Sequence, residues 1–307
     1  MKNQRIVIVG GVAGGATAAA KARRTNESAE IILFERGPHI SFANCGLPYF
    51  IGGEIPEHDS LLVTTPEAFS ARYRIQVNTR HEVMALDPEL RLLKVRDQHG
   101  SLQEVRYDKL ILSQGAEAIV PAIPGVDLAH VFTLRNIEDM DRIIAWLDSE
   151  HPRQAVVVGG GYIGLEMAPH ILPRLETDLA AELESQVLQP GFKIHSRRQV
   201  VEILPDAVLL DDGTRLAADL VMLGVGVRPE NRLAKAAGLE LGITGGLKTN
   251  GQMQTSDPNI YAVGDMAEVR HRLTGAAMRI PLAGPANRQG RVAGANAAGA
   301  HLNYGGG

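Results

Sequence analysis

The chain has 307 residues, enough for about two globular domains, and its 45% hydrophobic and 21% charged residues are an ordinary composition for a soluble protein. A net charge of -4 with no basic stripe argues against a nucleic-acid-binding function. No apolar run reaches the roughly 18 residues of a membrane span, and the N-terminus enters a strand without a signal-peptide pattern, so we expect a cytoplasmic protein that binds neither membranes nor nucleic acids.

The first elements predict one complete βαβ unit. The segment Arg5 to Val9 (RIVIV) is typical of a buried parallel strand, and the alanine-rich segment Ala16 to Arg24 is typical of a helix. A second strand, Ile31 to Phe34, leads to Glu35, which follows the intervening glycine turn by about 20 residues. A dinucleotide-binding fold places its ribose-binding acid at this spacing.

The turn between the first strand and the helix, GGVAGG, matches G-x-G-x-x-G at Gly10 and Gly15 but has Val12 at the middle position. A pyrophosphate approaches the main chain closely where side chains are absent, and it binds the free N–H groups and positive dipole of a helix N-terminus. A tight turn without a ligand is the alternative interpretation. Because Glu35 follows at the expected spacing, the turn favours dinucleotide binding.

A meander and a second nucleotide unit are predicted next. Residues 75–115 alternate as strands around turns at Asp87-Pro88 and at 98–100, and the strand Lys109 to Leu112 returns to the sheet. After a helix from Ile137 to Leu147, the strand Ala155 to Val158 leads into GGGYIG, which carries the complete G-x-G-x-x-G pattern. This second turn predicts an NAD(P)H site.

The last third of the chain returns to the first pattern. A second meander spans Val200 to Val221, and the strand Ile260 to Val263 leads into Gly264-Asp265. A final helix is expected near Gln289 to Ala300.

Cys45, within SFANCGLPY, is the only cysteine, so an internal disulfide is excluded. Sulfur redox chemistry would therefore need an external thiol or an oxidised oxygen species. A lone cysteine is most often a small buried hydrophobe, whereas a reactive one needs access and flanking backbone freedom. The surrounding residues favour the reactive interpretation.

That string and eight others, in order along the chain, resemble the pyridine nucleotide-disulfide oxidoreductases. The branch concerned has a single cysteine and contains coenzyme A-disulfide reductases, NADH oxidases and peroxidases, and persulfide or polysulfide reductases, the first being the most similar. The matching segments are GGVAGGATAAAKARR, FERG, SFANCGLPYFIGGEI, TPEAF, YDKLILSQGA, TLRN, VVVGGGYIGLEMA, GVGVRPEN and NIYAVGD.

The resemblance implies an α/β fold of two Rossmann-like FAD/NAD(P)-binding domains (three-layer ββα), the second inserted and shortened. The FAD-binding domain would comprise 1–118 and 246–307, and the NAD(P)H-binding domain 119–245. No metal is expected. The residues implied for FAD are Gly10, Gly11, Val12, Ala13, Gly14, Gly15, Glu35, Arg36, Ala43, Ser113, Gln114, Gly115, Ala116, Gly264 and Asp265. Those implied for NAD(P)H are Gly159, Gly161, Tyr162, Ile163, Gly164 and Glu166.

Cys45 matches the family nucleophile, which forms a mixed disulfide with coenzyme A. The residues implied to hold the coenzyme A substrate are Thr17, Lys21, Arg24, Ser41 and Asn44. For the run Lys21, Arg23 and Arg24 the alternative is a solvated helix face, although Arg and Lys are natural partners of phosphates.

Two departures from the family pattern are visible. After GLEMA, near 167–170, roughly 20 residues that would complete the second βαβ unit are missing. The family's C-terminal dimerisation domain is also missing after HLNYGGG, which leaves homodimer formation open. We therefore expect an FAD-dependent enzyme that uses NAD(P)H to reduce a coenzyme A-disulfide or a persulfide through Cys45. The alternatives are an NADH oxidase or peroxidase acting through a Cys45 sulfenic acid, and a catalytically idle flavin-binding module.

Overall fold

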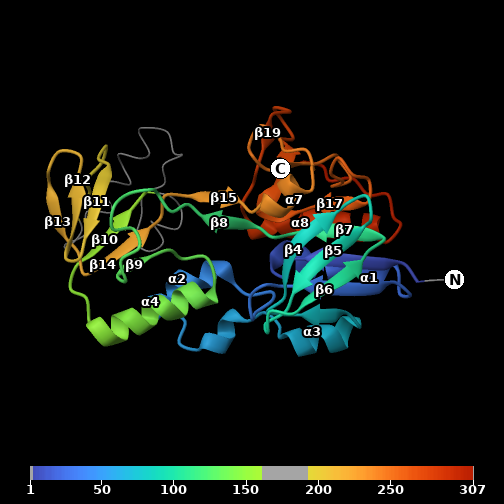
Figure 1. Cartoon of the computed structure of the whole chain (residues 1–307), viewed down its shortest axis with the longest axis horizontal. Coiled ribbons are helices and arrows are strands. Elements are labelled where there is room, and N and C mark those ends of the chain that lie inside the picture. The colour runs from blue at the N-terminus through green and yellow to red at the C-terminus, as the bar shows by residue number, and fades with distance from the viewer. Residues whose placement is uncertain (1–2, 161–192, 307) are drawn as a thin grey trace. The chain divides into compact units, whose positions relative to one another are not determined.

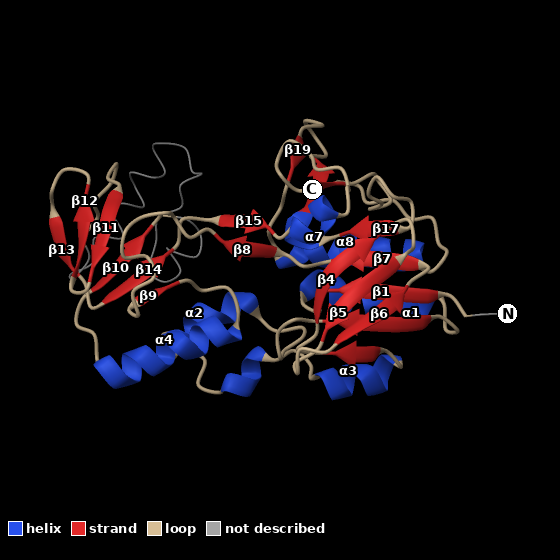
Figure 2. Ribbon diagram, viewed as in Figure 1, coloured by secondary structure: helices blue, strands red, loops and turns tan. Residues whose placement is uncertain are grey.

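The computed structural model describes residues 3–160 and 193–306 and divides into two compact units of mixed helices and strands (Figures 1 and 2). The first unit comprises Met1–Ala43, Leu62–Ala116 and Pro229–Gly307. The second unit comprises Asn44–Leu61 and Glu117–Arg228.

A five-stranded parallel sheet forms the centre of the first unit. Its strands are β17 (Ile260–Ala262), β7 (Lys109–Leu112), β1 (Arg5–Val9), β2 (Glu30–Phe34) and β3 (Gln76–Asn78), in that order. In the three strands β1, β7 and β17, nearly all side chains on both faces are buried, as the continuous β-branched and aliphatic runs predict for a parallel sheet. Because all five strands are parallel, their carboxyl ends lie at one edge.

Two helices from opposite ends of the sequence, α1 (Ala13–Thr25) and α8 (Ala283–Ala297), lie side by side (Figure 1). Their contact is unusually close, because a Cβ at Gly290 would overlap the main chain of Gly14 and a Cβ at Gly294 would overlap that of Ala18. Small residues at these positions therefore allow the two helices to touch through their backbones.

The predicted meander is an antiparallel sheet of β4 (Glu82–Asp87), β5 (Leu92–Arg96) and β6 (Leu102–Arg106). Its buried residues, such as Val83 and Leu93, join the same core as those of β1. A further helix, α3 (Pro66–Tyr73), is capped by Thr65, whose hydroxyl accepts the Ala68 N–H at 3.2 Å. The remaining elements of this unit are α7 (Arg232–Ala236), β16 (Leu247–Lys248), η3 (Gly264–Met266), β18 (Ala267–Arg270) and β19 (Ala277–Met278).

The second unit contains a parallel sheet in the order β10 (Ala155–Val158), β14 (Leu220–Leu223) and β9 (Val131–Phe132). The second meander consists of β11 (Val200–Leu204), β12 (Ala207–Leu210) and β13 (Arg215–Ala217). The Asn136 side chain caps the amphipathic helix α4 (Ile137–Glu150) by accepting the Asp139 N–H at 2.8 Å. The short helices are η1 (Asn44–Gly46), α2 (Leu47–Ile51) and η2 (His58–Leu61), and β8 (Ala116–Ala118) pairs with β15 (Val227–Pro229).

Some boundaries differ from those expected. Helix α8 begins at Ala283 instead of near Gln289 and ends at Ala297. The early start is possible because Pro285 lies in the first turn, where its missing N–H costs no helical hydrogen bond. Residues 229–245 pack with the first unit and residues 44–61 with the second, whereas each segment was expected in the other domain. Which ligand each unit binds stays a prediction.

Arg23 is buried, at 9% exposure, so the solvated-face interpretation of the basic run is wrong for this residue. Its guanidinium donates to five main-chain carbonyl oxygens in two nearby segments, and desolvation by burial lowers its pKa. The acceptors are the carbonyl groups of Asn26, Glu27, Ala29, Tyr73 and Arg74.

Replacing Arg23 with alanine should therefore lower the free energy of unfolding by about 3 kcal/mol or more, because five buried or partly buried carbonyl groups lose their donor. The matched control is Arg24→Ala, which removes an exposed guanidinium that donates to the Tyr73 hydroxyl at 3.1 Å. That loss should stay below about 1 kcal/mol. Urea unfolding measures both, and equal losses would contradict the structural role of Arg23.

Candidate functional site

The glycine turn that follows β1 is shaped by close main-chain packing. Gly10 has a φ of +97°, and a Cβ there would overlap the carbonyl oxygen of Ser113 at the end of β7. A Cβ at Gly15 would overlap the carbonyl oxygen of Gly10. Glycine is thus required at both positions for the strand to turn into the helix, whatever the turn binds.

The start of α1 has the donor set that an anion requires. Val12 occupies the N-cap position and offers no side-chain cap, and the first turn contains no acidic residue. The first N–H groups of a helix have no intrahelical acceptor, and together with the helix dipole they favour a phosphate. The residues present therefore fit a pyrophosphate at this turn.

Glu35 lies directly beside this turn. Its Oε2 accepts the Gly11 N–H at 2.7 Å and its Oε1 accepts the Gly37 N–H at 2.9 Å. These bonds hold the carboxylate at the carboxyl end of β2, next to the end of β1. The structure therefore brings together the turn and the acid that the sequence placed about 20 residues apart.

The carboxyl ends of β7 and β17 complete this edge of the sheet. The Ser113 N–H donates to the Val9 carbonyl at 2.7 Å, and the Gln114 N–H faces the Met266 sulfur at 3.3 Å. The Gln114 Oε1 atom is buried and has no hydrogen-bond partner among the described residues. The segments 10–15, Glu35, 113–116 and 264–265 thus meet at one edge, where parallel α/β sheets bind their ligands.

Gln289 supports the same edge, although no sequence motif predicted it as a site residue. It is 1% exposed, and its Oε1 accepts the Gly264 N–H at 2.7 Å, next to Asp265. Gly264 has a φ of +78°, so this bond holds a turn that glycine readily adopts. A lone glutamine within an alanine- and glycine-rich helix was the available signal.

The residues predicted to hold the thiol substrate are placed differently from one another. Ser41, with a φ of 47°, donates its N–H to the Gly11 carbonyl at 3.0 Å and so lies at the glycine turn. The Thr17 hydroxyl donates to the Asn287 side chain at 2.8 Å across the α1–α8 contact. Lys21 is partly exposed and Arg24 is exposed, so both cationic groups are accessible to a ligand.

Cys45 is an exposed free thiol in η1 of the second unit, so the interpretation as a small buried hydrophobe is wrong. The neighbouring Asn44 amide donates to the Arg135 carbonyl at 3.3 Å. Ala43, the last residue of the preceding segment of the first unit, is partly exposed. In the sequence, Cys45 follows Ser41 by only four positions.

The second glycine turn begins like the first. Gly159 has a φ of +103°, and a Cβ there would lie 2.7 Å from the Gly224 carbonyl oxygen. The Gly224 N–H donates to the Val158 carbonyl at 2.8 Å, as Ser113 donates to Val9 in the first unit. The predicted residues Gly161, Tyr162, Ile163, Gly164 and Glu166, and the shortening near 167–170, lie outside the described residues.

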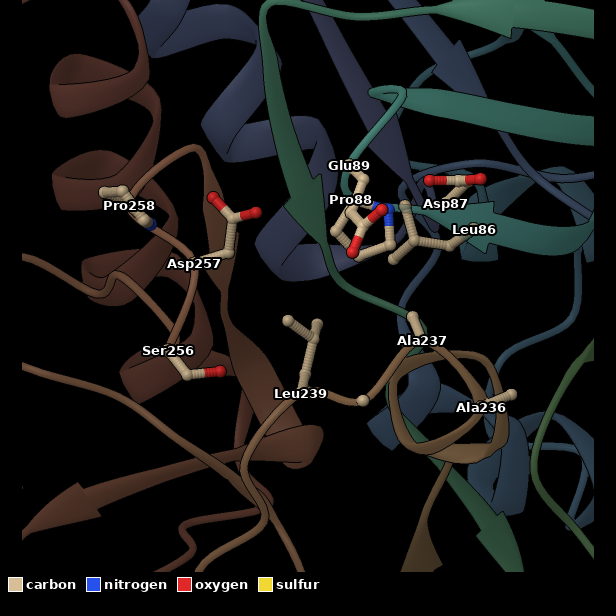
Figure 3. A pocket seen from close by; sticks show the side chains of 11 residues that line it. Leu86, Asp87, Pro88, Glu89, Ala236, Ala237, Leu239, Ser256, Asp257 and Pro258 are labelled. Atoms are coloured by element: carbon tan, nitrogen blue, oxygen red, sulfur yellow. The ribbon is translucent and has the colours of Figure 1, made fainter.

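A cleft of about 570 Å³ lies elsewhere in the first unit (Figure 3). Residues 86–89, 236–239 and 256–258 line it, and none of these was predicted as a site residue. Nearby Tyr107 is buried, which raises the pKa of its hydroxyl.

Within residues 3–160 and 193–306, no helix is long and apolar enough to span a membrane, and no group of three or more His, Cys, Asp or Glu side chains could hold a metal ion.

Among known protein families, the one described as pyridine nucleotide-disulphide oxidoreductase matches residues 4–290 of this chain. An NADH oxidase of Methanocaldococcus jannaschii is 35% identical, with 98% of this chain and 71% of the relative covered. A coenzyme A disulfide reductase of Staphylococcus haemolyticus is 34% identical, with 94% and 69% covered. These matches bear out the predicted resemblance.

A solved structure, reduced Bacillus anthracis CoADR-RHD, superposes with a TM-score of 0.94 at 42% identity and covers 97% of this chain. This chain spans 57% of that protein's chain. The similarity confirms the predicted α/β fold with Rossmann-type domains. The alignment with the Methanocaldococcus relative runs over 321 positions, more than the 307 residues of this chain, so some of the relative's residues have no counterpart here.

Proposed function

Because this chain belongs to the pyridine nucleotide-disulphide oxidoreductase family, we propose that it is an FAD-dependent enzyme that uses NAD(P)H to reduce a small disulfide through Cys45. The observation that carries the proposal is the convergence of the uncapped glycine turn, Glu35 and the 113–116 and 264–265 segments at one edge of a parallel sheet. Such an edge is where a dinucleotide binds in this fold class.

FAD would be held by residues of the first unit in distinct roles. The N–H groups at the start of α1 would bind its pyrophosphate, and the Glu35 carboxylate would accept hydrogen bonds from the adenosine ribose. Asp265 is proposed to bond the ribityl chain, with Gln289 holding the turn in front of it. The buried, unpartnered Gln114 oxygen provides a further acceptor at the same edge.

In the proposed reaction, the bound flavin would accept a hydride from NAD(P)H and deliver an electron pair to the sulfur of Cys45. Cys45 rests as a mixed disulfide with a small thiol, because the chain offers no second cysteine. Two electrons and one proton convert this mixed disulfide to the Cys45 thiolate and the free thiol. The thiolate then attacks one sulfur of an incoming disulfide, expels the other half as thiolate, and reforms the mixed disulfide.

We propose coenzyme A as that thiol, in a coenzyme A-disulfide or persulfide reductase. The basic side chains of Lys21 and Arg24 are accessible on α1, whereas Arg23 is used in the fold, so the first two remain available for phosphate groups. The Methanocaldococcus relative is named NADH oxidase, which favours the second candidate, an oxidase or peroxidase that acts through a Cys45 sulfenic acid.

Anaerobic titration of the purified, FAD-loaded protein with NADH, and separately with NADPH, tests whether the nucleotide unit works. We expect the visible flavin absorbance to bleach with one of the two donors at two equivalents per flavin, because the first hydride reduces the Cys45 mixed disulfide through the flavin and the second leaves the flavin itself reduced. Chemical reduction with dithionite is the control for a reducible flavin. If dithionite bleaches the flavin and neither nucleotide does, the chain is an idle flavin-binding module.

A further inference from the structure

Glu230 is a buried carboxylate beside the proposed FAD site, with 3% of its side chain exposed. Arg232 binds it as a fork: Nε donates to Oε1 at 2.9 Å and Nη2 donates to Oε2 at 2.7 Å. A buried carboxylate is costly unless it is paired in this way. Arg232 therefore fixes the orientation of the Glu230 carboxylate.

A second guanidinium approaches the same carboxylate. The Nη1 atom of Arg36 lies 3.7 Å from Oε2 of Glu230, within ion-pair distance. Half of the Arg36 side chain is exposed, and the residue directly follows Glu35 at the end of β2. The Glu230 Oε2 atom that binds Arg232 thus also attracts the guanidinium of Arg36.

The main chain of Glu230 is attached to another part of the same site. Its N–H donates to the Gly115 carbonyl at 3.0 Å, and Gly115 has a φ of +71° in the segment after β7. Glu230 consequently joins two segments that both belong to the proposed FAD site, residues 35–36 and residues 113–116. No sequence spacing pointed to Glu230, because it lies in the segment 119–245 that was expected to form the NAD(P)H-binding domain.

We propose that Glu230 is a positioning residue that holds the guanidinium of Arg36 beside the adenosine half of FAD. The inference rests on the proposed function, in which Glu35 binds the adenosine ribose, so that the next residue reaches the purine attached to it. A guanidinium is planar and stacks on aromatic rings. Without the Glu230 carboxylate, the Arg36 guanidinium loses an anionic partner that restricts its orientation, and it binds the purine less well.

The test compares FAD with FMN, which carries the same isoalloxazine ring but lacks the adenosine half. Dissociation constants of both flavins are measured on flavin-free protein by quenching of flavin fluorescence. Glu230→Gln should weaken FAD binding about tenfold and leave FMN binding unchanged. Arg36→Ala should do the same, and the double variant should be no weaker than Arg36→Ala alone, because Glu230 acts through Arg36.

Glu240→Gln is the matched control, since it removes an exposed carboxylate of the same unit that pairs with Lys248 at 2.6 Å. It should change neither constant. Equal weakening of FAD and FMN by Glu230→Gln, or additive losses in the double variant, would overturn the inference. If Glu230→Gln does not fold, Arg36→Lys decides: it keeps the charge but loses the planar group, and an unchanged FAD constant would overturn the inference. Failure of the wild-type protein to bind FAD would instead refute the proposed function.

Discussion

The Cys45→Ser variant should bind FAD and be reduced by NAD(P)H like the wild-type protein, yet lose disulfide reduction by at least about a thousandfold. A hydroxyl is not ionised at neutral pH and forms no mixed disulfide, so the electron pair has no sulfur to reach. Because Cys45 is exposed, the substitution leaves no cavity and should not alter the fold. Stopped-flow flavin reduction measures the reductive half-reaction by itself, and steady-state turnover with coenzyme A disulfide measures the complete cycle.

The mass of the unreduced protein identifies the resting state of the same cysteine. Wild-type protein should carry an adduct of the mass of coenzyme A, and Cys45→Ser should carry none. An adduct of one oxygen atom would instead indicate a Cys45 sulfenic acid and support the oxidase or peroxidase alternative. A disulfide-reducing activity that survives in Cys45→Ser would show that the nucleophile is not Cys45.

The Gly294→Ala variant should lose about 3 kcal/mol of unfolding free energy, at the upper end of what overpacking typically costs. An alanine Cβ at this position would overlap the Ala18 carbonyl oxygen and lie 2.9 Å from the Ala18 carbonyl carbon, so α8 must move away from α1. Main-chain atoms cannot move aside as a flexible side chain can, and overpacking of this kind is among the more costly core changes. Since α1 begins at the glycine turn, FAD affinity should fall as well.

Gly284→Ala is the matched control in the same helix. No atom lies within 4 Å of its added Cβ, so the substitution should be neutral or stabilise the protein by up to about 1 kcal/mol through the higher helix propensity of alanine. Urea unfolding monitored by circular dichroism and by flavin fluorescence compares the two variants. Comparable stability of Gly294→Ala and Gly284→Ala would mean that α1 and α8 do not touch through their backbones.

Much of the first unit was predictable from local pattern. The strand Arg5–Val9 was predicted with its observed bounds, since a run of β-branched residues followed by glycines leaves few alternatives. The helix after it was expected from Ala16 and begins at Ala13, because helix ends are weakly encoded when the N-cap is a valine. The position of Glu35 beside Gly11 also followed from spacing alone, as the fold of a βαβ unit determines it.

The partners of charged side chains were not predictable in the same way. Arg23 and Arg24 are adjacent basic residues in the sequence, yet one is buried against five carbonyl groups and the other is exposed. Burial of a charge depends on which segments supply its acceptors, and two of those for Arg23 are the carbonyl groups of Tyr73 and Arg74, distant in sequence. Propensity and periodicity carry no information about such contacts.

Cys45 and its surrounding residues were thus recognisable from the sequence by itself, as were the α/β class and the two glycine turns. These features are local, because the chemistry of a turn or a nucleophile resides in a few consecutive residues. The tertiary structure alone decided that Glu230 joins Arg36 to the Gly115 turn, that Gln289 holds Gly264, and that Gly290 and Gly294 must be glycines. Each of these depends on a contact between distant segments, and the free energy of such contacts arises only when the chain packs.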